Sequence, residues 1–148
     1  MRECLDASVV VKWFKKDELH NKEADELFQR IRDAEAEYVA SEWILLEVTR
    51  GLVKAGVNKE EVEEAYKILS QLSHLGAVKL IPVTQTLKLA KDLEIELDLY
   101  AADAVHLATA IITESNVLWS EDEHLHKSRV RNCVKKHKLE IRNLKTIC

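Results

Sequence analysis

The sequence predicts an α/β fold with a mostly parallel sheet that is covered by helices on both sides. Short apolar stretches that read as strands recur along the chain, and amphipathic helical stretches separate them. Strands that alternate with helices are joined by crossovers, and crossovers produce parallel strands. With 148 residues, 47% hydrophobic and 32% charged, the chain has the size and composition of a single globular domain over residues 1–148.

The first half of the chain is expected to contain two strands and three helical segments. In order, they are a strand over 2–5, a helical segment over 9–14, a helix over about 21–36, a strand over 37–40 and a helix over 42–55. Ser41 is a plausible N-cap for the last helix, and Gly56 is a plausible stop.

The second half continues the alternation of helices and strands. The expected elements are a helix from 59 to about 75, a strand over 78–83, a helix after Thr84, a helix around 100–111, a strand over 117–119, a short helix after Ser120 and a strand over 139–144. The stretches 58–61 and 120–123 both have the spacing of a capping box. Because Pro82 cannot donate a backbone hydrogen bond, its strand is expected at or near a sheet edge.

The stretch YAADAVHLATAI (residues 100–111) contains a single acid, Asp103, among alanines and aliphatic residues. Its alanines remove bulk, so this helix is expected to lie close to the sheet, with Leu107 and Ile111 one turn apart on the buried face. The helix dipole favours an aspartate near the helix start. The same placement directs the Asp103 carboxylate beyond that end. Helix capping alone would also explain Asp103.

Three further acids are expected near the same edge of the sheet. Asp6 follows the first strand and Asp122 follows the strand over 117–119, and sites in parallel sheets form where strands end. Glu47 lies in the helix that follows the second strand. It is expected beyond the first turn of that helix, so the helix dipole does not explain an acid there. Taken singly, each has a structural explanation: Asp6 as a turn former, Glu47 as a surface helix residue and Asp122 as a helix-start acid.

Four carboxylates that converge need a counter-charge, because like charges raise one another's pKa. A small set of oxygen ligands suits Mg²⁺ or Mn²⁺, which keep several waters and bind substrate phosphates. The matching chemistry is phosphodiester hydrolysis, in which one ion activates water and, in two-metal sites, a second ion about 4 Å away stabilises the leaving oxygen. Zinc is disfavoured, because His106, His124 and His126 have no cysteine near them in the sequence.

The same residues resemble the PIN-domain nucleases, especially the VapC-type toxins of toxin–antitoxin pairs, over essentially the whole chain. The resemblance lies in four segments: LDASVVVKWF (5–14), SEWILLEVTRGL (41–52), AADAVHLATAI (101–111) and VLWSEDEHL (117–125). Each segment is short and rich in aliphatic residues, so the specificity comes from their order and spacing.

The resemblance implies a three-layer α/β/α domain and an Mg²⁺- or Mn²⁺-dependent endoribonuclease. It implies that four acids are catalytic: Asp6, Glu47, Asp103 and Asp122. Of these, Asp6, Asp103 and Asp122 would hold the metal, and the Ser120 hydroxyl would orient the site or its water. It also implies an RNA substrate, often transfer or ribosomal RNA, a cognate antitoxin and a homodimer.

Two assignments around these acids stay open in the sequence. Ser8 lies near Asp6 and either touches water in the site or caps the following helix. Glu121 and Glu123 flank Asp122, so the last acid could be shifted by one residue. Asp122 is preferred because it keeps the spacing of two residues from the serine that the family pattern requires.

Other functions of an acidic α/β pocket fit less well. A receiver domain needs an acid beside Asp6, where Leu5 and Ala7 stand, and a dehalogenase-like phosphatase needs an aspartate where Ser8 stands. The alternatives that remain are a non-catalytic PIN-fold binding module and an RNA processing or quality-control nuclease without an antitoxin.

Charge and composition limit the environment and the partners of the protein. The net charge is −4, but the charges are unevenly spread: residues 127–148 hold eight of the 22 Lys and Arg and only one of the 26 acids. This basic tail is a candidate RNA contact. Three lysines near Asp6 in the sequence could add to it: Lys12, Lys15 and Lys16. The apolar runs are too short for a bilayer and the three cysteines are widely spaced, so a cytoplasmic location without membrane attachment is expected.

Three tryptophans are expected in the core rather than in base stacking: Trp13, Trp43 and Trp119.

Overall fold

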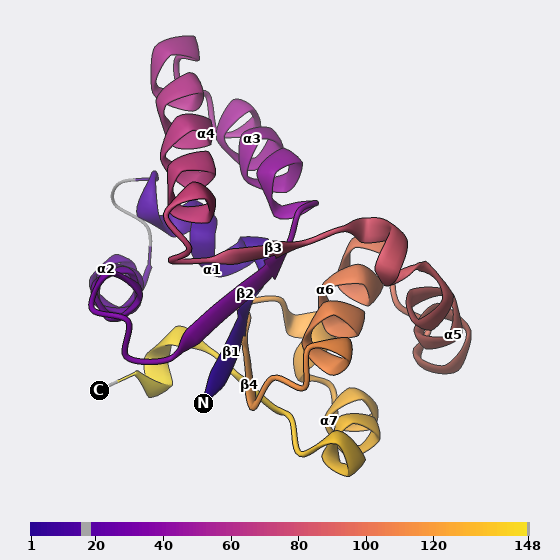
Figure 1. The fold of residues 1–148 in the computed structure, drawn as a ribbon. Coiled ribbons are helices and arrows are strands. Elements are labelled where there is room, and N and C mark those ends of the chain that lie inside the picture. The colour runs from indigo at the N-terminus through magenta and orange to yellow at the C-terminus, as the bar shows by residue number, and fades with distance from the viewer. Residues whose placement is uncertain (16–18, 148) are drawn as a thin grey trace.

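The computed structural model describes residues 1–15 and 19–147, which form a three-layer α/β/α architecture (Figure 1). Lys16 and Cys148 lie outside the described residues. Five strands form a sheet in the order β3-β2-β1-β4-β5. They are β1 (Arg2–Leu5), β2 (Glu37–Ser41), β3 (Lys79–Ile81), β4 (Val117–Trp119) and β5 (Glu140–Arg142). The four pairings in this sheet are parallel, so the predicted fold class is confirmed.

Helices precede and follow the strands as the alternating pattern requires. The α-helices are α1 (Ala7–Val10), α2 (Asn21–Arg32), α3 (Ile44–Lys54), α4 (Lys59–His74), α5 (Leu87–Leu97), α6 (Ala101–Ile112) and α7 (Ser128–Val134). The 3₁₀ turns are η1 (Val11–Trp13), η2 (Val83–Gln85), η3 (Glu123–His126), η4 (Lys135–His137) and η5 (Leu144–Thr146). No helix among the described residues is both long and apolar enough to cross a membrane.

The two faces of the sheet bury separate cores, because successive strand residues point to opposite sides. Leu5 packs with Leu27 of α2 and Leu52 of α3, on the face covered by α1 to α4. Its neighbour Cys4 packs with Leu107 of α6, on the face covered by α5 to α7. Figure 1 shows α2 on one side of the sheet and α6 and α7 on the other. This arrangement fixes the carboxyl edge of the sheet between the two layers.

Helix α6 lies close to the sheet, as its alanines predict. Ala104, Leu107 and Ala108 have no solvent exposure, and Cys4 of β1 belongs to the same core. Small side chains allow the helix backbone to approach the strands, and Leu107 fills the remaining space. The first turn of α6 is thereby held at the carboxyl edge of the sheet.

Several predicted helix ends are confirmed by the backbone. Gly56 and Gly76 follow α3 and α4 with φ angles of 79° and 78°, which a residue without Cβ adopts without strain. The Asn58 side chain accepts a hydrogen bond from the backbone N–H of Glu61 at 2.9 Å, so the cap of α4 is also confirmed.

Other predicted helix boundaries are wrong. Ser41 ends β2 instead of capping a helix from residue 42, and its Oγ accepts from the Trp43 N–H while α3 begins at Ile44. Thr84 lies within η2, and α5 begins three residues later, at Leu87. In both places a short turn comes between the predicted cap and the helix, so the capping residue type marks the region but not the first helical residue.

Two other elements are shorter than predicted. The helix expected over 21–36 ends at Arg32, because Ala34 has a φ of 52°, outside the helical region. The strand expected over 78–83 ends at Ile81, directly before Pro82. This strand, β3, lies at an edge of the sheet, as the proline predicts.

Candidate active site at the carboxyl edge of the sheet

The strand register brings the ends of β1 and β4 to the same level. Leu5 pairs with Trp119 in the parallel ladder, and the Asp6 N–H donates to the Trp119 carbonyl at 3.0 Å. On the outer side, the Ser120 N–H donates to the Arg142 carbonyl of β5 at 2.9 Å. Asp6 and Ser120 therefore leave the sheet side by side, as expected for parallel strands.

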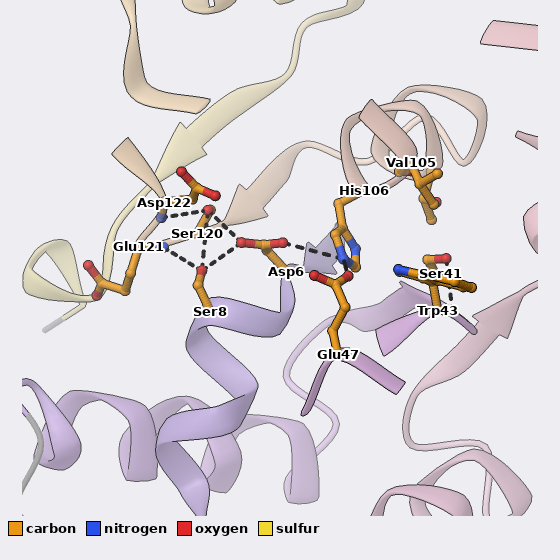
Figure 2. A network of polar contacts seen from close by, with 11 residues as sticks. Asp6, Ser8, Ser41, Trp43, Glu47, Val105, His106, Ser120, Glu121 and Asp122 are labelled. Atoms are coloured by element: carbon orange, nitrogen blue, oxygen red, sulfur yellow. Dashed lines mark hydrogen bonds and ion pairs between the residues drawn. The ribbon is translucent and has the colours of Figure 1, made fainter. Parts of the chain in front are cut away.

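Two serines hold the Asp6 carboxylate (Figure 2). Asp6 Oδ2 accepts from Ser8 Oγ at 2.6 Å and from Ser120 Oγ at 2.8 Å. Ser8 Oγ accepts in turn from the Glu121 N–H at 2.8 Å, and Ser120 Oγ accepts from the Asp122 N–H at 3.0 Å. Both hydroxyls thus bridge the end of β1 to the loop after β4. The other oxygen, Oδ1, is bonded to neither serine, and the residue as a whole is only 3% exposed.

Asp103 and Asp122 form a second pair of acids. Asp103 is the third residue of α6 and is 7% exposed. Burial, a hydrogen bond with Asp122 and the charges of Asp122 and Asp6 raise the pKa of Asp103 to about 8, although His106 opposes the shift. At neutral pH Asp103 therefore retains its proton when no cation is bound. Asp122 also caps η3 by accepting from the His124 N–H at 2.9 Å, a role that the sequence had suggested for Ser120.

Glu47 lies in the first turn of α3 and not beyond it as predicted, because the helix begins at Ile44. From there it meets His106 of α6 (Figure 2). Glu47 Oε1 is hydrogen-bonded and ion-paired with His106 Nε2. The same nitrogen lies 3.5 Å from Asp6 Oδ1, and the imidazole has no solvent exposure. Burial lowers the pKa of His106, but the charges of Asp6, Glu47 and Asp103 outweigh it, so the pKa is raised overall.

These acids line a small open pocket of about 200 Å³. Its lining residues are Asp6, Ala7, Ser8, Val11, Glu47, Gly51, Asp103 and Asp122. A larger hollow of about 850 Å³ includes Met1, Glu37 and Thr113, at the opposite end of the sheet. The only acid among the residues that line this hollow is Glu37, which pairs with Arg2 at 2.8 Å, so the smaller pocket is the candidate for chemistry.

The donor set of the pocket fits a hard divalent cation. Asp6, Asp103 and Asp122 offer carboxylate oxygens, and the raised pKa of Asp103 marks a position where positive charge is needed. Within residues 1–15 and 19–147, no three acidic, histidine or cysteine side chains already stand as a closed metal cluster. A bound ion would therefore require loss of the Asp103 proton, with water as the remaining ligands.

Neither of the acids that flank Asp122 lines this pocket. Glu121 Oε1 accepts from the Leu144 N–H at 3.0 Å, which ties the loop to η5, and Figure 2 shows its side chain directed away from Asp6. Glu123 is exposed in η3 and does not line the pocket. The geometry therefore favours Asp122 over a position shifted by one residue.

Sequence reasoning missed two features around the acids. His106 stands three residues after Asp103, and this spacing placed it near the cleft but did not identify Glu47 as its partner. Tyr100, the residue before α6, is 75% exposed and packs edge-on against His124, with ring centroids 5.8 Å apart. Trp43, expected in the core, is 42% exposed at the start of the helix that carries Glu47. Aromatic surface therefore flanks the acids.

Comparison with known proteins adds to this geometry. The family model described as the PIN domain matches residues 4–130. A chain of VapBC2 from Rickettsia felis, solved in complex with a DNA fragment from its promoter, shares the fold with a TM-score of 0.67 and 19% identity, covering 97% of this chain and 98% of that one. A chain of FitAB bound to an IR36 DNA fragment has a TM-score of 0.65 and 13% identity, covering 96% and 94%. A search of curated protein sequences gave no significant match.

Proposed function

Because the chain belongs to the PIN-domain family, whose members are generally nucleases, we propose that it is an Mg²⁺- or Mn²⁺-dependent endoribonuclease and the toxin of a VapBC-type pair. The observation that carries the proposal is the gathering of Asp6, Glu47, Asp103 and Asp122 around one pocket at the carboxyl edge of the sheet. The raised pKa of Asp103 supports it, because strongly shifted pKa values are typical of functional sites.

In this proposal Asp6, Asp103 and Asp122 hold the ion, and Ser8 and Ser120 fix the Asp6 carboxylate through hydrogen bonds at 2.6 and 2.8 Å. When bound, Mg²⁺ or Mn²⁺ would supply charge neutralisation at the scissile phosphate and increase the acidity of water. Asp103 would lose its proton, so that its carboxylate could serve as a ligand.

Glu47 accepts the proton of the attacking water in this mechanism. His106 holds one oxygen of its carboxylate, so the other oxygen accepts the hydrogen bond from water. Water attacks phosphorus in line, the bond between phosphorus and the 3′-oxygen breaks, and the leaving 3′-oxygen takes a proton from solvent, which gives a 5′-phosphate and a 3′-hydroxyl. No covalent bond between enzyme and RNA forms.

We propose RNA as the substrate, held by basic residues around the pocket rather than by the whole basic tail. Lys127 and Arg129 are exposed and follow η3 directly, so they lie close to Asp122 along the chain. Lys135 and Lys136 lie past the other end of α7. A helix of seven residues is about 10 Å long, so these lysines are farther from Asp122 than Lys127 is. Lys12 of η1, which follows the helix after Asp6, adds positive charge near that end of the chain, and its Nζ donates to the Leu19 carbonyl at 2.7 Å. A cytoplasmic location follows from this substrate.

We further propose a cognate antitoxin and a homodimer. The two structural relatives are components of VapBC2 and FitAB assemblies, which supports a protein partner. Three apolar side chains are exposed along α3 and at its start: Trp43, Leu46 and Val53. An antitoxin segment that covers them would also cover the Glu47 side of the pocket, which suits inhibition. Light scattering of the isolated chain and of the complex tests both associations.

The first experiment is incubation of a mixed RNA pool with the protein plus Mn²⁺, the protein plus EDTA, and the Asp103→Asn variant plus Mn²⁺. Cleavage that needs both the ion and Asp103, with fragments that carry 5′-phosphates, is the expected result. The matched control is Asp25→Asn, which changes an exposed acid of α2. Cleavage by Asp103→Asn at the wild-type rate would refute the assignment. A protein that binds no Mn²⁺ and cuts no RNA would instead be a non-catalytic binding module, and cutting without an adjacent antitoxin gene would indicate a processing nuclease.

A further inference from the structure

The loop after β4 is closed on its outer side by a histidine and an arginine. His126 Nε2 is hydrogen-bonded to the Ser120 carbonyl at 2.7 Å, across the loop that carries Asp122. Arg131 of α7 holds the same histidine: its Nη2 lies 2.6 Å from His126 Nδ1, and its Nε donates to the His126 carbonyl at 3.1 Å. The guanidinium therefore holds His126 at two points, and the ring reaches the end of β4.

The two neighbours of the His126 ring decide which of its nitrogens donates. A guanidinium has only donors, so His126 Nδ1 accepts the hydrogen bond from Arg131. A carbonyl oxygen has only lone pairs, so Nε2 carries the hydrogen and donates it to Ser120. The ring thus connects the arginine to the backbone through two hydrogen bonds that run in the same direction.

On the inner side of the loop the same peptide unit reaches Asp6 (Figure 2). The Ser120 carbonyl and the Glu121 N–H belong to one planar trans peptide, so they point in opposite directions. The Glu121 N–H donates to Ser8 Oγ at 2.8 Å, and Ser8 Oγ donates to Asp6 Oδ2 at 2.6 Å. One continuous chain of hydrogen bonds therefore runs from the outer side of the loop to the Asp6 carboxylate.

The two ends of this chain carry opposite charges. Arg131 is an exposed, permanent cation, and Asp6 is a buried acid that lines the pocket. A group that accepts a hydrogen bond donates its own hydrogen more strongly, so bonds that run head to tail polarise one another. The chain therefore lets an exposed cation of α7 hold the orientation of a carboxylate that it does not touch.

We infer that Arg131 and His126 are positioning residues for the reaction: they hold the peptide between Ser120 and Glu121, and through it the acid end of the chain of hydrogen bonds. This inference rests on the proposed nuclease function. It also separates Arg131 from Arg129, a cation of the same helix that is proposed to hold RNA. Arg131 acts on the backbone of the protein itself.

Arg131→Lys tests the inference with the charge retained. A lysine cannot contact the His126 ring and the His126 carbonyl together as the planar guanidinium does. Loss of an outer hydrogen-bond partner typically costs an active site about 10- to 100-fold, so kcat for RNA cleavage should fall at least about tenfold while KM changes little. Arg32→Lys, at an exposed position of α2, is the matched control and should change neither constant. Arg129→Gln should instead raise KM.

Variants of His126 test whether Arg131 acts through the ring. His126→Leu removes the donor to Ser120 and should lower kcat at least about tenfold, whereas the amide of His126→Gln can still donate there and should keep kcat within about threefold. The double variant Arg131→Lys with His126→Leu should be no slower than His126→Leu alone. Two residues that acted independently would instead show effects that multiply.

Amide hydrogen exchange, followed by nuclear magnetic resonance in EDTA, provides a readout that needs neither RNA nor metal. In Arg131→Lys the Glu121 amide should exchange about tenfold faster than in the wild type, because the peptide is held less firmly. The amide of Cys4, which lies in β1 with no solvent exposure, should exchange at the wild-type rate.

The outcomes separate this inference from the function on which it rests. A wild-type kcat in Arg131→Lys, or effects of Arg131 and His126 that multiply, would overturn the inference and leave the nuclease. Equal acceleration of exchange at Glu121 and Cys4 would overturn it as well, because the pair would then only stabilise the fold. A wild-type protein that cuts no RNA would overturn the proposed function, and the inference with it. If His126→Leu does not fold, Arg131→Lys and His126→Gln still decide the question.

Discussion

Replacing Asp103 with asparagine is expected to make the metal-free protein more stable while it abolishes activity. In the folded chain the pKa of Asp103 is raised from 3.8 to about 8, mainly by burial and by its hydrogen bond with Asp122. Each pKa unit corresponds to about 1.4 kcal/mol, so ionising this group would cost the folded state about 6 kcal/mol above pH 8 if nothing relieved it. An asparagine has the same shape and carries no charge, so it avoids this cost.

The observable gain is smaller than that upper limit. The pocket opens to solvent, which screens the repulsion, and the first turn of α6 favours a negative charge by up to about 1 kcal/mol. We therefore expect a gain in the free energy of unfolding of about 1–2 kcal/mol for Asp103→Asn near pH 8. For a chain of this length the melting temperature should rise by about 3–6 °C.

The gain should depend on pH in a defined direction. Because the folded-state pKa is raised, Asp103 favours folding fully only below 3.8, and its contribution is lost as the pH rises through about 8. The difference between Asp103→Asn and the wild type should thus be largest above about pH 8 and close to zero near pH 4.

Thermal unfolding followed by circular dichroism in EDTA, at several pH values, measures this difference. Asp25→Asn on α2 is the control and should change the melting temperature little at any pH. Addition of Mn²⁺ at about 100 times its dissociation constant should stabilise the wild type by about 2.7 kcal/mol and leave Asp103→Asn unchanged. A variant that melts at or below the wild-type temperature at pH 8 in EDTA would refute the electrostatic reasoning.

Three further predictions concern residues around and away from the pocket. Ser120→Ala removes the hydrogen bond to Asp6 Oδ2 and the one from the Asp122 N–H. The rate of cleavage should therefore fall at least about tenfold, and the free energy of unfolding by about 1–3 kcal/mol. Cleavage at the wild-type rate would contradict this. Tyr100→Ala should weaken binding of single-stranded RNA by about 5- to 50-fold in fluorescence titrations, and Tyr100→Phe should not, because an exposed aromatic ring stacks on bases. Asn58→Ala should lower the free energy of unfolding by about 1 kcal/mol in urea titrations and leave cleavage unchanged, since it removes only the cap of α4.

The gathering of the acids was predictable because it depends on two simple patterns. The short strands β1 and β4 show in the apolar pattern, and each is followed by a polar residue that the parallel register places at one edge. The alanines of α6 predict its close approach to the sheet, which places Asp103 near Asp6. These features depend on the periodicity of the chain, so they can be inferred from the sequence.

What the sequence did not predict depends on contacts between distant segments. The partner of His106 is set by how α3 packs beside α6, and no local pattern encodes that distance. Trp43 is exposed because α3 begins at Ile44 rather than at residue 42, which leaves its ring at the helix start outside the core. Hydroxyl side chains that favour helix caps also bond within turns, as Ser41 does, so cap residues alone misplace helix starts.

The bond between the Ser120 N–H and the Arg142 carbonyl has a consequence for the timing of activity during synthesis. The last strand of the sheet holds the end of β4, and with it the serine that bonds to Asp6 and the loop that carries Asp122. A ribosome delivers the segment around Asp6 first and residue 142 only after all four acids, and chains fold as their segments emerge. A nascent chain therefore carries its four acids before the pocket can close. In the nuclease proposed above, this order delays cutting until β5 has joined the sheet and gives an inhibitor time to bind first.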